Sequence, residues 1–233
     1  MPGMTAGGTG TRGRPKRTAS AAAASRAVAP AGQGPRPPEG FDEARAAEMI
    51  LAGEVPPSAW WPFITRLDLS GRPDERREFS DLAPLRALTN LRALNCSSTQ
   101  VSDLAPLQAL TNLERLNCSF TQVSGLAPLQ ELTNLEMLYC WNTQVSDLAP
   151  LRALTNLRTL NCSGTQVSDL APLQALTNLE TLDIRATRVT DASVLKHLSK
   201  LTILGGPGET GAVSVAIRRG RQFLGRVLRR TKE

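Results

Sequence analysis

A 22-residue unit recurs almost unchanged through the middle of the chain. Its four copies occupy residues 88–109, 110–131, 132–153 and 154–175. Self-similarity with a period of about 20–50 residues is typical of stacked-repeat architectures, in which each repeat buries its apolar edge only against its neighbours. The unit therefore predicts a solenoid. Because identical positions serve the stacking, function is expected where the copies differ.

The net charge of +6 is distributed unevenly along the chain. Residues 1–40 hold six Lys or Arg and one acid, and residues 205–233 hold seven Lys or Arg and two acids. The segment between them carries 14 basic and 18 acidic residues, so it is acidic. A nucleic acid or an anionic membrane as partner must therefore be argued from the two ends.

One cysteine occupies the same position of each copy, and these are Cys96, Cys118, Cys140 and Cys162. Metal ligands converge on one point, usually as closely spaced pairs, whereas these thiols form a ladder along the solenoid. We expect buried core thiols, with no metal site, disulfide framework or cofactor. Reduced thiols favour the cytoplasm, and no signal peptide is evident. Secretion by another route is left open.

The composition divides the chain into four segments. Residues 1–40, rich in Gly, Ala, Pro and Arg, are predicted to be disordered, because they offer too little apolar area to offset their ordering entropy. Residues 41–63 contain a predicted helix that begins at Asp42 and stops at Gly53, followed by Trp60 and Trp61. They are expected to cap the solenoid of residues 64–206. A basic amphipathic helix is predicted within residues 207–233.

Each repeat combines two local patterns. Alternating apolar residues such as Leu94 and Cys96 indicate a short strand. The segment from Asp103 to Leu107 indicates one tight helical turn, with Asp103 as its cap and Pro106 tolerated near its start. Asn90 and its equivalents favour the turn back into the next strand.

These positions closely resemble the 22-residue leucine-rich repeats of internalin-like and phosphatase-regulator-like proteins. The resemblance implies an α/β repeat solenoid, a right-handed curved rod with about seven short parallel strands on its concave face and tight helical turns on its convex face. We expect a monomeric, non-catalytic scaffold that binds a protein partner on the concave face. Threonine such as Thr99 replaces the family's asparagine, whose side chain bonds neighbouring backbone. We expect the hydroxyl to donate one such bond.

The concave face offers the best candidate site. Most of its rungs carry small polar residues, but residues 135–142 contain Met137, Tyr139 and Trp141, and Phe120 precedes them by one repeat. Exposed side chains of these types dominate interface energies. The alternative is drift among repeats, with Trp141 lying flat on its neighbours. The remaining predicted partner-binding residues are polar, namely Arg115, Asn117, Asn161 and Arg185.

Catalysis has little support in the sequence. The single histidine, His197, falls in the degenerate last repeat, and no nucleophile–base pair or phosphate-binding glycine loop is evident. We expect no enzymatic activity.

The basic ends suggest other partners. Arg12, Gly13, Arg14 and Pro15 resemble an AT-hook, in which an extended Arg-Gly-Arg enters the narrow minor groove of A·T-rich DNA. Residues 212–232 separate apolar from basic side chains at helical spacing, so they could cap the last repeat or lie on an anionic membrane. A DNA- or membrane-tethered adaptor and a bacterial effector delivered to another cell are therefore the alternative functions.

Overall fold

The computed structural model describes residues 36–72, 76–206 and 214–215. Contacts divide the chain into two units, residues 1–36 and 37–233. All the described residues except Arg36 belong to the second unit. The predicted disordered tail up to residue 35, with its AT-hook-like motif, lies outside the described residues. The same holds for most of the predicted C-terminal helix.

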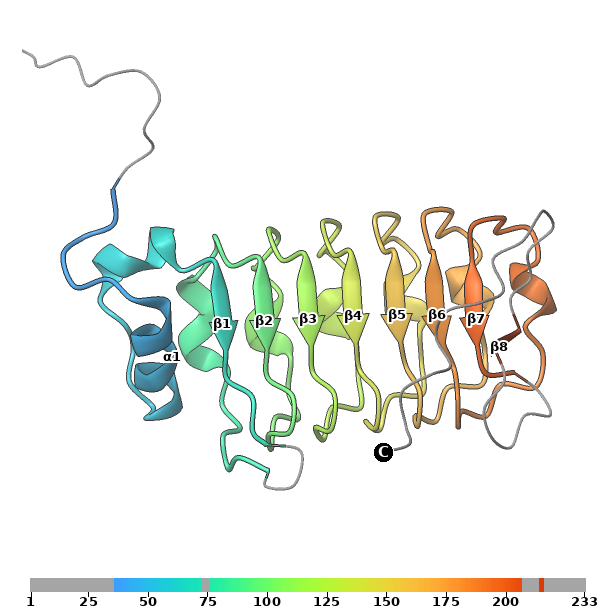
Figure 1. Cartoon of the computed structure of the whole chain (residues 1–233), viewed down its shortest axis with the longest axis horizontal. Helices are drawn as coiled ribbons and strands as arrows, with labels where there is room; N and C mark the ends of the chain where they lie inside the picture. Colours follow the sequence, from blue (N-terminus) through green and yellow to red (C-terminus); the bar gives the residue numbers. More distant parts are fainter. Residues whose placement is uncertain (1–35, 73–75, 207–213, 216–233) are drawn as a thin grey trace, which may run out of the picture. The chain divides into compact units, whose positions relative to one another are not determined.

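Seven three-residue strands form one parallel sheet in chain order, as the repeat predicted (Figure 1). Neighbouring strands pair in register, so that Leu94 lies beside Leu116 and Leu116 beside Leu138. A 22-residue repeat thus returns each side chain to the same face, one rung further along the stack. The strands are β1 (Arg66–Asp68), β2 (Ala93–Asn95), β3 (Arg115–Asn117), β4 (Met137–Tyr139), β5 (Thr159–Asn161), β6 (Thr181–Asp183) and β7 (Thr202–Leu204).

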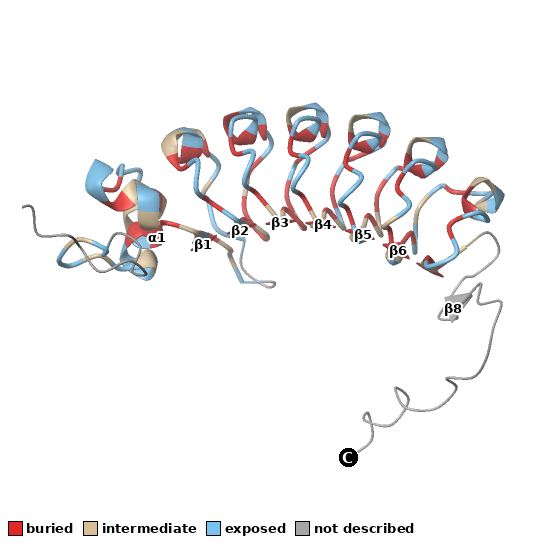
Figure 2. Cartoon of the chain, turned by 90° about the horizontal axis from the view of Figure 1, so that it is seen from above, coloured by how far each residue is buried: buried red, intermediate tan, exposed pale blue. Residues whose placement is uncertain are grey.

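Short 3-10 helices form the opposite side of the stack (Figure 2). The predicted aspartate cap is confirmed, because the carboxylate of Asp103 accepts a hydrogen bond of 2.8 Å from the backbone N–H of Ala105. Pro106 stands within the first turn, where no intrahelical N–H is needed. The 3-10 helices are η2 (Ala83–Ala87), η3 (Ala105–Leu107), η4 (Ala127–Leu129), η5 (Ala149–Leu151), η6 (Ala171–Leu173) and η7 (Ser193–Leu195).

Columns of buried leucine and cysteine form the core between the strands and the 3-10 helices. In the repeat centred on β4, Leu135, Leu138, Cys140 and Leu151 are all 0% exposed. All four cysteines are buried free thiols, as predicted. The thiols of Cys96, Cys118 and Cys162 each contact a backbone oxygen of the next repeat; Cys118 Sγ, for example, lies 3.5 Å from the carbonyl oxygen of Tyr139.

Asparagine side chains tie each repeat to the one before it. Asn112 Nδ2 donates to the carbonyl oxygen of Thr89, and Asn134 Nδ2 donates to that of Thr111, each at 2.9 Å. Sequence alone favoured only a turn at these positions. The bonds link repeats along the outer corner of the stack, where backbone carbonyls would otherwise lack a protein donor.

The hydrogen bonds of the repeated threonines differ from the prediction. The hydroxyl of Thr121 donates to the carbonyl oxygen of Cys118 within its own repeat, at 2.6 Å, and Thr143 bonds Cys140 in the same way. A threonine hydroxyl stands closer to its own backbone than an asparagine amide does, so it satisfies the local turn instead of a neighbouring repeat. Backbone bonds link the repeats here, as between Gln122 N–H and the Val101 carbonyl oxygen.

We expect Thr121→Val to lower the free energy of unfolding by about 1–2 kcal/mol, because a buried carbonyl loses its donor while the side-chain volume is unchanged. Urea denaturation of the full chain measures the change. Thr133→Val is the matched control, since the Thr133 side chain is exposed and forms no hydrogen bond with the described residues. Equal unfolding midpoints for the two variants would contradict the assigned role of the hydroxyl.

The N-terminal end is closed by helix α1 (Glu43–Leu51) and the 3-10 helix η1 (Ser58–Phe63). Asp42 caps α1 through a 2.9 Å bond to Ala44 N–H, as predicted. The carboxylate of Glu43 accepts hydrogen bonds from the N–H groups of Thr65 and Arg66, at 2.9 and 3.1 Å. Because β1 is the edge strand of the sheet, this carboxylate satisfies donors that would otherwise be open to pairing.

The C-terminal end departs from the regular repeat at β7 and from the predicted helix at β8. Ile203, and not Leu204, pairs with Leu182, because this repeat is one residue shorter before its strand. Strand β8 (Ser214–Val215) pairs antiparallel with β7, whereas the sequence predicted helix from residue 212. The open edge of β7 offers unpaired backbone groups, which favour an added strand at this point.

Candidate functional site

The strands present two columns of side chains on their outward, concave face. Leucines alternate with these residues and point inward, as expected for the two-residue period of a strand. The first column is Arg66, Ala93, Arg115, Met137, Thr159 and Thr181, and the second is Asp68, Asn95, Asn117, Tyr139, Asn161 and Asp183. Strand β4 is therefore the only described strand with two large apolar or aromatic residues on this face.

The aromatic cluster consists of Phe120, Met137, Tyr139 and Trp141. The rings of Phe120 and Trp141 meet edge to face, with centroids 4.1 Å apart and planes inclined at 65°. All four side chains are half-buried, so each is exposed only in part. Adjacent strands are about 4.8 Å apart, so large side chains on this face contact the neighbouring rungs.

The backbone beside the strands adopts the left-handed region in successive repeats. Phe120 has φ of 56° and Asn142 has φ of 52°. Gly164, at the same position one repeat later, has φ of 65°, and a Cβ there would collide with the side-chain oxygen of Asn142. This position turns the chain out of the strand, and at Phe120 it directs an aromatic side chain toward Trp141 at some cost in backbone strain.

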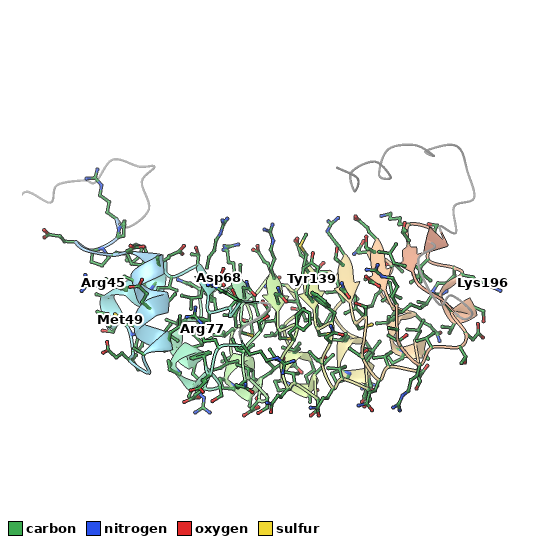
Figure 3. The ribbon with its side chains drawn as sticks, turned by 60° about the horizontal axis from the view of Figure 1, so that its bottom comes forward. Arg45, Met49, Asp68, Arg77, Tyr139 and Lys196 are labelled. Atoms are coloured by element: carbon green, nitrogen blue, oxygen red, sulfur yellow. The ribbon has the colours of Figure 1, made fainter. Side chains whose placement is uncertain are left out.

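A larger hollow of about 750 Å³ lies between α1 and the first four strands. Three predicted residues, Arg115, Asn117 and Tyr139, contribute to its lining. Figure 3 labels two others, Asp68 of β1 and Arg77 of the following loop. The lining contains side chains of both positive and negative charge. The acids are Glu43, Glu48 and Asp68, and the arginines are Arg66, Arg77 and Arg115.

A smaller hollow of about 320 Å³ lies beyond the aromatic cluster. It also contains three predicted residues, Trp141, Asn161 and Arg185. Its lining is completed by Asn142, Ser163, Gly164 and Ala186. The predicted residues are thus placed on both sides of the cluster: Tyr139 borders the larger hollow and Trp141 the smaller one, while Met137 lines neither.

Sequence reasoning missed the contribution of α1 and of Arg77 to the larger hollow. Arg77 forms an isolated parallel bridge with Thr99, and its N–H donates to the carbonyl oxygen of Ser98 at 3.0 Å. These contacts fold the long segment between β1 and β2 back against the second repeat. The segment between β1 and β2 is charged and longer than the 22-residue repeat requires, and this extra length was the available signal. It did not indicate against which part of the protein the segment folds.

Arg185 and Asp183 form the one ion pair on the concave face within the described residues. Arg185 Nη2 lies 2.6 Å from Asp183 Oδ2, and Arg185 Nε lies 2.9 Å from Asp183 Oδ1. The Asp183 residue is 3% exposed. Hydrogen bonding to this carboxylate, followed by its charge, raises the pKa of Arg185 above its ordinary value. The other ion pairs, Arg92 with Glu114 and Arg158 with Glu180, link neighbouring repeats one residue before their strands.

His197 lies on an exposed turn, where its Nε2 is 2.8 Å from the carbonyl oxygen of Gln174. Within the described ranges, no group of three potential metal ligands converges. Over the same residues, no helix is long and apolar enough to cross a membrane.

The family model "Leucine Rich repeats (2 copies)" matches residues 89–132, 111–153, 133–175 and 155–197. These matches cover the whole regular part of the solenoid. Residues 89–197 are leucine-rich repeats, and they are similar to those of internalins. Comparison with curated protein sequences gave no match.

Solved structures show the same fold. Internalin C2 from Listeria monocytogenes is 30% identical, with a TM-score of 0.55 over 62% of this chain and 63% of that one. The internalin inlF of the same species is 25% identical, with a TM-score of 0.53 over 70% of this chain and 54% of that one. A leucine-rich-repeat protein of Leptospira interrogans, 20% identical, has a TM-score of 0.55 over 66% and 42%. The chain thus spans less than two thirds of each.

Proposed function

We propose that this protein is a non-catalytic scaffold that binds a protein partner on its concave face, centred on Phe120, Met137, Tyr139 and Trp141. The observation that carries the proposal is the contrast between β4 and its neighbours. The equivalents of Trp141 are Ser97, Ser119 and Ser163, so one aromatic rung interrupts a polar ladder. Leucine-rich-repeat proteins are generally interaction scaffolds, which agrees with this assignment.

The geometry of the cluster suits an interface anchor. Aromatic side chains carry much of the energy of protein interfaces, particularly at the centre of a contact where water is excluded. Phe120 and Trp141 already contact one another, so little side-chain entropy is lost when a partner covers them. The two hollows on either side would receive side chains that flank the partner's central contact.

Trp141→Ala should abolish partner capture, because it removes the largest side chain at the centre of the proposed interface. The measurement is a pull-down from a lysate with the full chain as bait, followed by mass spectrometry. Proteins captured by the wild type and lost with the variant are the candidate partners. Thermal unfolding of the same preparations should give nearly the same midpoint, because Trp141 lies outside the leucine and cysteine core.

Trp141→Ser is a sharper version of the same test, since it installs the residue that the ladder itself carries at this position. Arg152→Ala is the matched control and should leave capture intact. Arg152 is exposed and directly follows η5, on the side of the stack opposite the strands. Retention of every partner by both Trp141 variants, or loss of folding in step with loss of capture, would defeat the proposal.

A further inference from the structure

Arg185 is a firmly positioned charged side chain on the concave face. Three of its hydrogen bonds run from Nε and Nη2 to the carboxylate of Asp183, at 2.6 to 3.2 Å. Gly205 packs against its other side, where a Cβ would lie only 2.7 Å from Arg185 Cγ. Gly205 has φ of 84°, a conformation that favours glycine. Both the stem and the head of Arg185 are therefore held in place.

Asp183 and Arg185 differ from the residues at the equivalent positions of the preceding repeat. In the preceding repeat, Asn161 Oδ1 accepts from the N–H of Ser163, and in this repeat Asp183 Oδ1 accepts from the N–H of Arg185. The backbone turn is thus the same with either pair of residues. Replacing Asn and Ser by Asp and Arg is not needed for the turn, and it adds a guanidinium anchored by a buried carboxylate.

The anchored guanidinium retains free binding capacity. Its side chain is 61% exposed, and Nη1 donates no hydrogen bond to any described residue. Among the described residues that line the smaller hollow, Arg185 is the only charged one, and the Asp183 carboxylate paired with it is buried. The exposed charge at the smaller hollow is therefore that of the guanidinium, partly offset by its buried partner Asp183, whereas the larger hollow mixes three acids with three arginines. Charge complementarity favours an anion in the smaller hollow.

Building on the proposed function, we infer that the smaller hollow receives an acidic side chain, Asp or Glu, of the protein partner. The carboxylate binds the outward edge of the Arg185 guanidinium while the adjoining part of the partner packs on Trp141. An arginine fork suits a carboxylate because it presents parallel N–H donors in a fixed plane. Asn161 contributes a further donor, since its Oδ1 is occupied by Ser163 and its Nδ2 bonds no described residue.

The probe is a random peptide library displayed on phage, selected against the immobilised full chain at physiological ionic strength. Peptides whose binding depends on Trp141 are then synthesised, and their affinities are measured by fluorescence polarisation. We expect these peptides to be enriched in Asp or Glu. Replacing the selected acid by its amide should weaken binding roughly ten- to hundredfold, the range of a charge-assisted hydrogen bond to a buried or positioned partner.

The protein variants assign this preference to one side chain. Arg185→Gln should remove the difference between acid and amide peptides. Because that change leaves Asp183 buried without its countercharge, the double variant Asp183→Asn with Arg185→Ser is the second test, since it recreates the pair found at Asn161 and Ser163. Arg188→Ser removes the same charge from an exposed position outside the hollow and should preserve the preference.

The outcomes separate this inference from the proposed function. Trp141-dependent peptides without acidic enrichment would overturn the acidic-anchor inference alone. It would also be overturned if the folded double variant kept the acid preference, or if Arg188→Ser abolished it. A library that yields no Trp141-dependent peptide contradicts the proposed function, and the inference that rests on it falls as well.

Discussion

Ile50→Asp should remove most of the folded population at room temperature, although Ile50 lies outside the repeats. Its side chain is 0% exposed and packs with Ala46 and Ala47 against the first repeat. Truncating a buried isoleucine costs about 2–5 kcal/mol, and an unpaired carboxylate at the same place adds several more. The sum is comparable with the whole stability of a typical domain, about 5–15 kcal/mol.

The effect is expected to spread because the solenoid has no central core. Each repeat is stabilised by its neighbours, so an undocked cap removes the contacts of α1 with β1 and uncovers the end of the stack, where Leu67 is buried. It also withdraws Glu43 from the N–H groups of Thr65 and Arg66. An open, apolar edge strand is a template for aggregation, so the variant should scatter light as it loses structure.

Arg45→Asp is the matched control for this change. It introduces the same residue on the same helix, at an exposed position that Figure 3 labels. Urea unfolding followed by far-ultraviolet circular dichroism measures both variants against the wild type. An Ile50→Asp protein as stable as Arg45→Asp would show that the repeats fold without the cap.

The regular part of the fold could be predicted because its causes are local and repeated. A leucine every few residues, an aspartate before each turn and a proline inside it give the same result in every copy. Where a copy lacks one of them, the sequence shows it directly, as at Gly125, which stands in place of the capping aspartate. The register of β7 was harder to predict, because the repeat before it is one residue shorter. That deletion is compatible with pairing either Ile203 or Leu204 to β6.

The candidate site was predicted only in part, because it depends on how distant segments meet. The proximity of Phe120 and Trp141 followed from the repeat period, since one lies a single rung from the other. The left-handed backbone at Phe120 did not, because four of the five residues at this position are not glycine. The fork between Arg185 and Asp183, two residues apart, depended on which way the arginine turns, and sequence spacing does not fix that direction.

Raising the pH from about 9 to about 11 should destabilise the protein steeply through its four thiols, by about 1.4 kcal/mol per thiol and pH unit once the unfolded thiols are ionised. Burial raises the pKa of Cys118 to about 12. Burial, followed by the charge of Asp183, raises the pKa of Cys162 to about 12. The pKa values of Cys96 and Cys140 are raised for the same main reason, burial.

The direction of the pH effect depends on whether the native or the unfolded state retains the thiol protons. Well below pH 9 the thiols are protonated in both states, so they contribute no pH dependence there. Between pH 9 and about 12 the unfolded chain releases thiol protons that the native protein retains. The free energy of unfolding therefore falls as the pH rises through this window, and with all four thiols the slope approaches roughly 5 kcal/mol per pH unit.

Urea titrations at a series of pH values measure this slope, and a variant with all four cysteines replaced by alanine is the control. The variant will be less stable at neutral pH, because alanine leaves small voids in the ladder. Its slope should nevertheless be much shallower, since lysine and tyrosine titration is common to both proteins. The thiols should also resist iodoacetamide in the native protein and react after unfolding. Parallel slopes for wild type and variant would show that the ladder thiols ionise without unfolding, and so that they are reached by solvent.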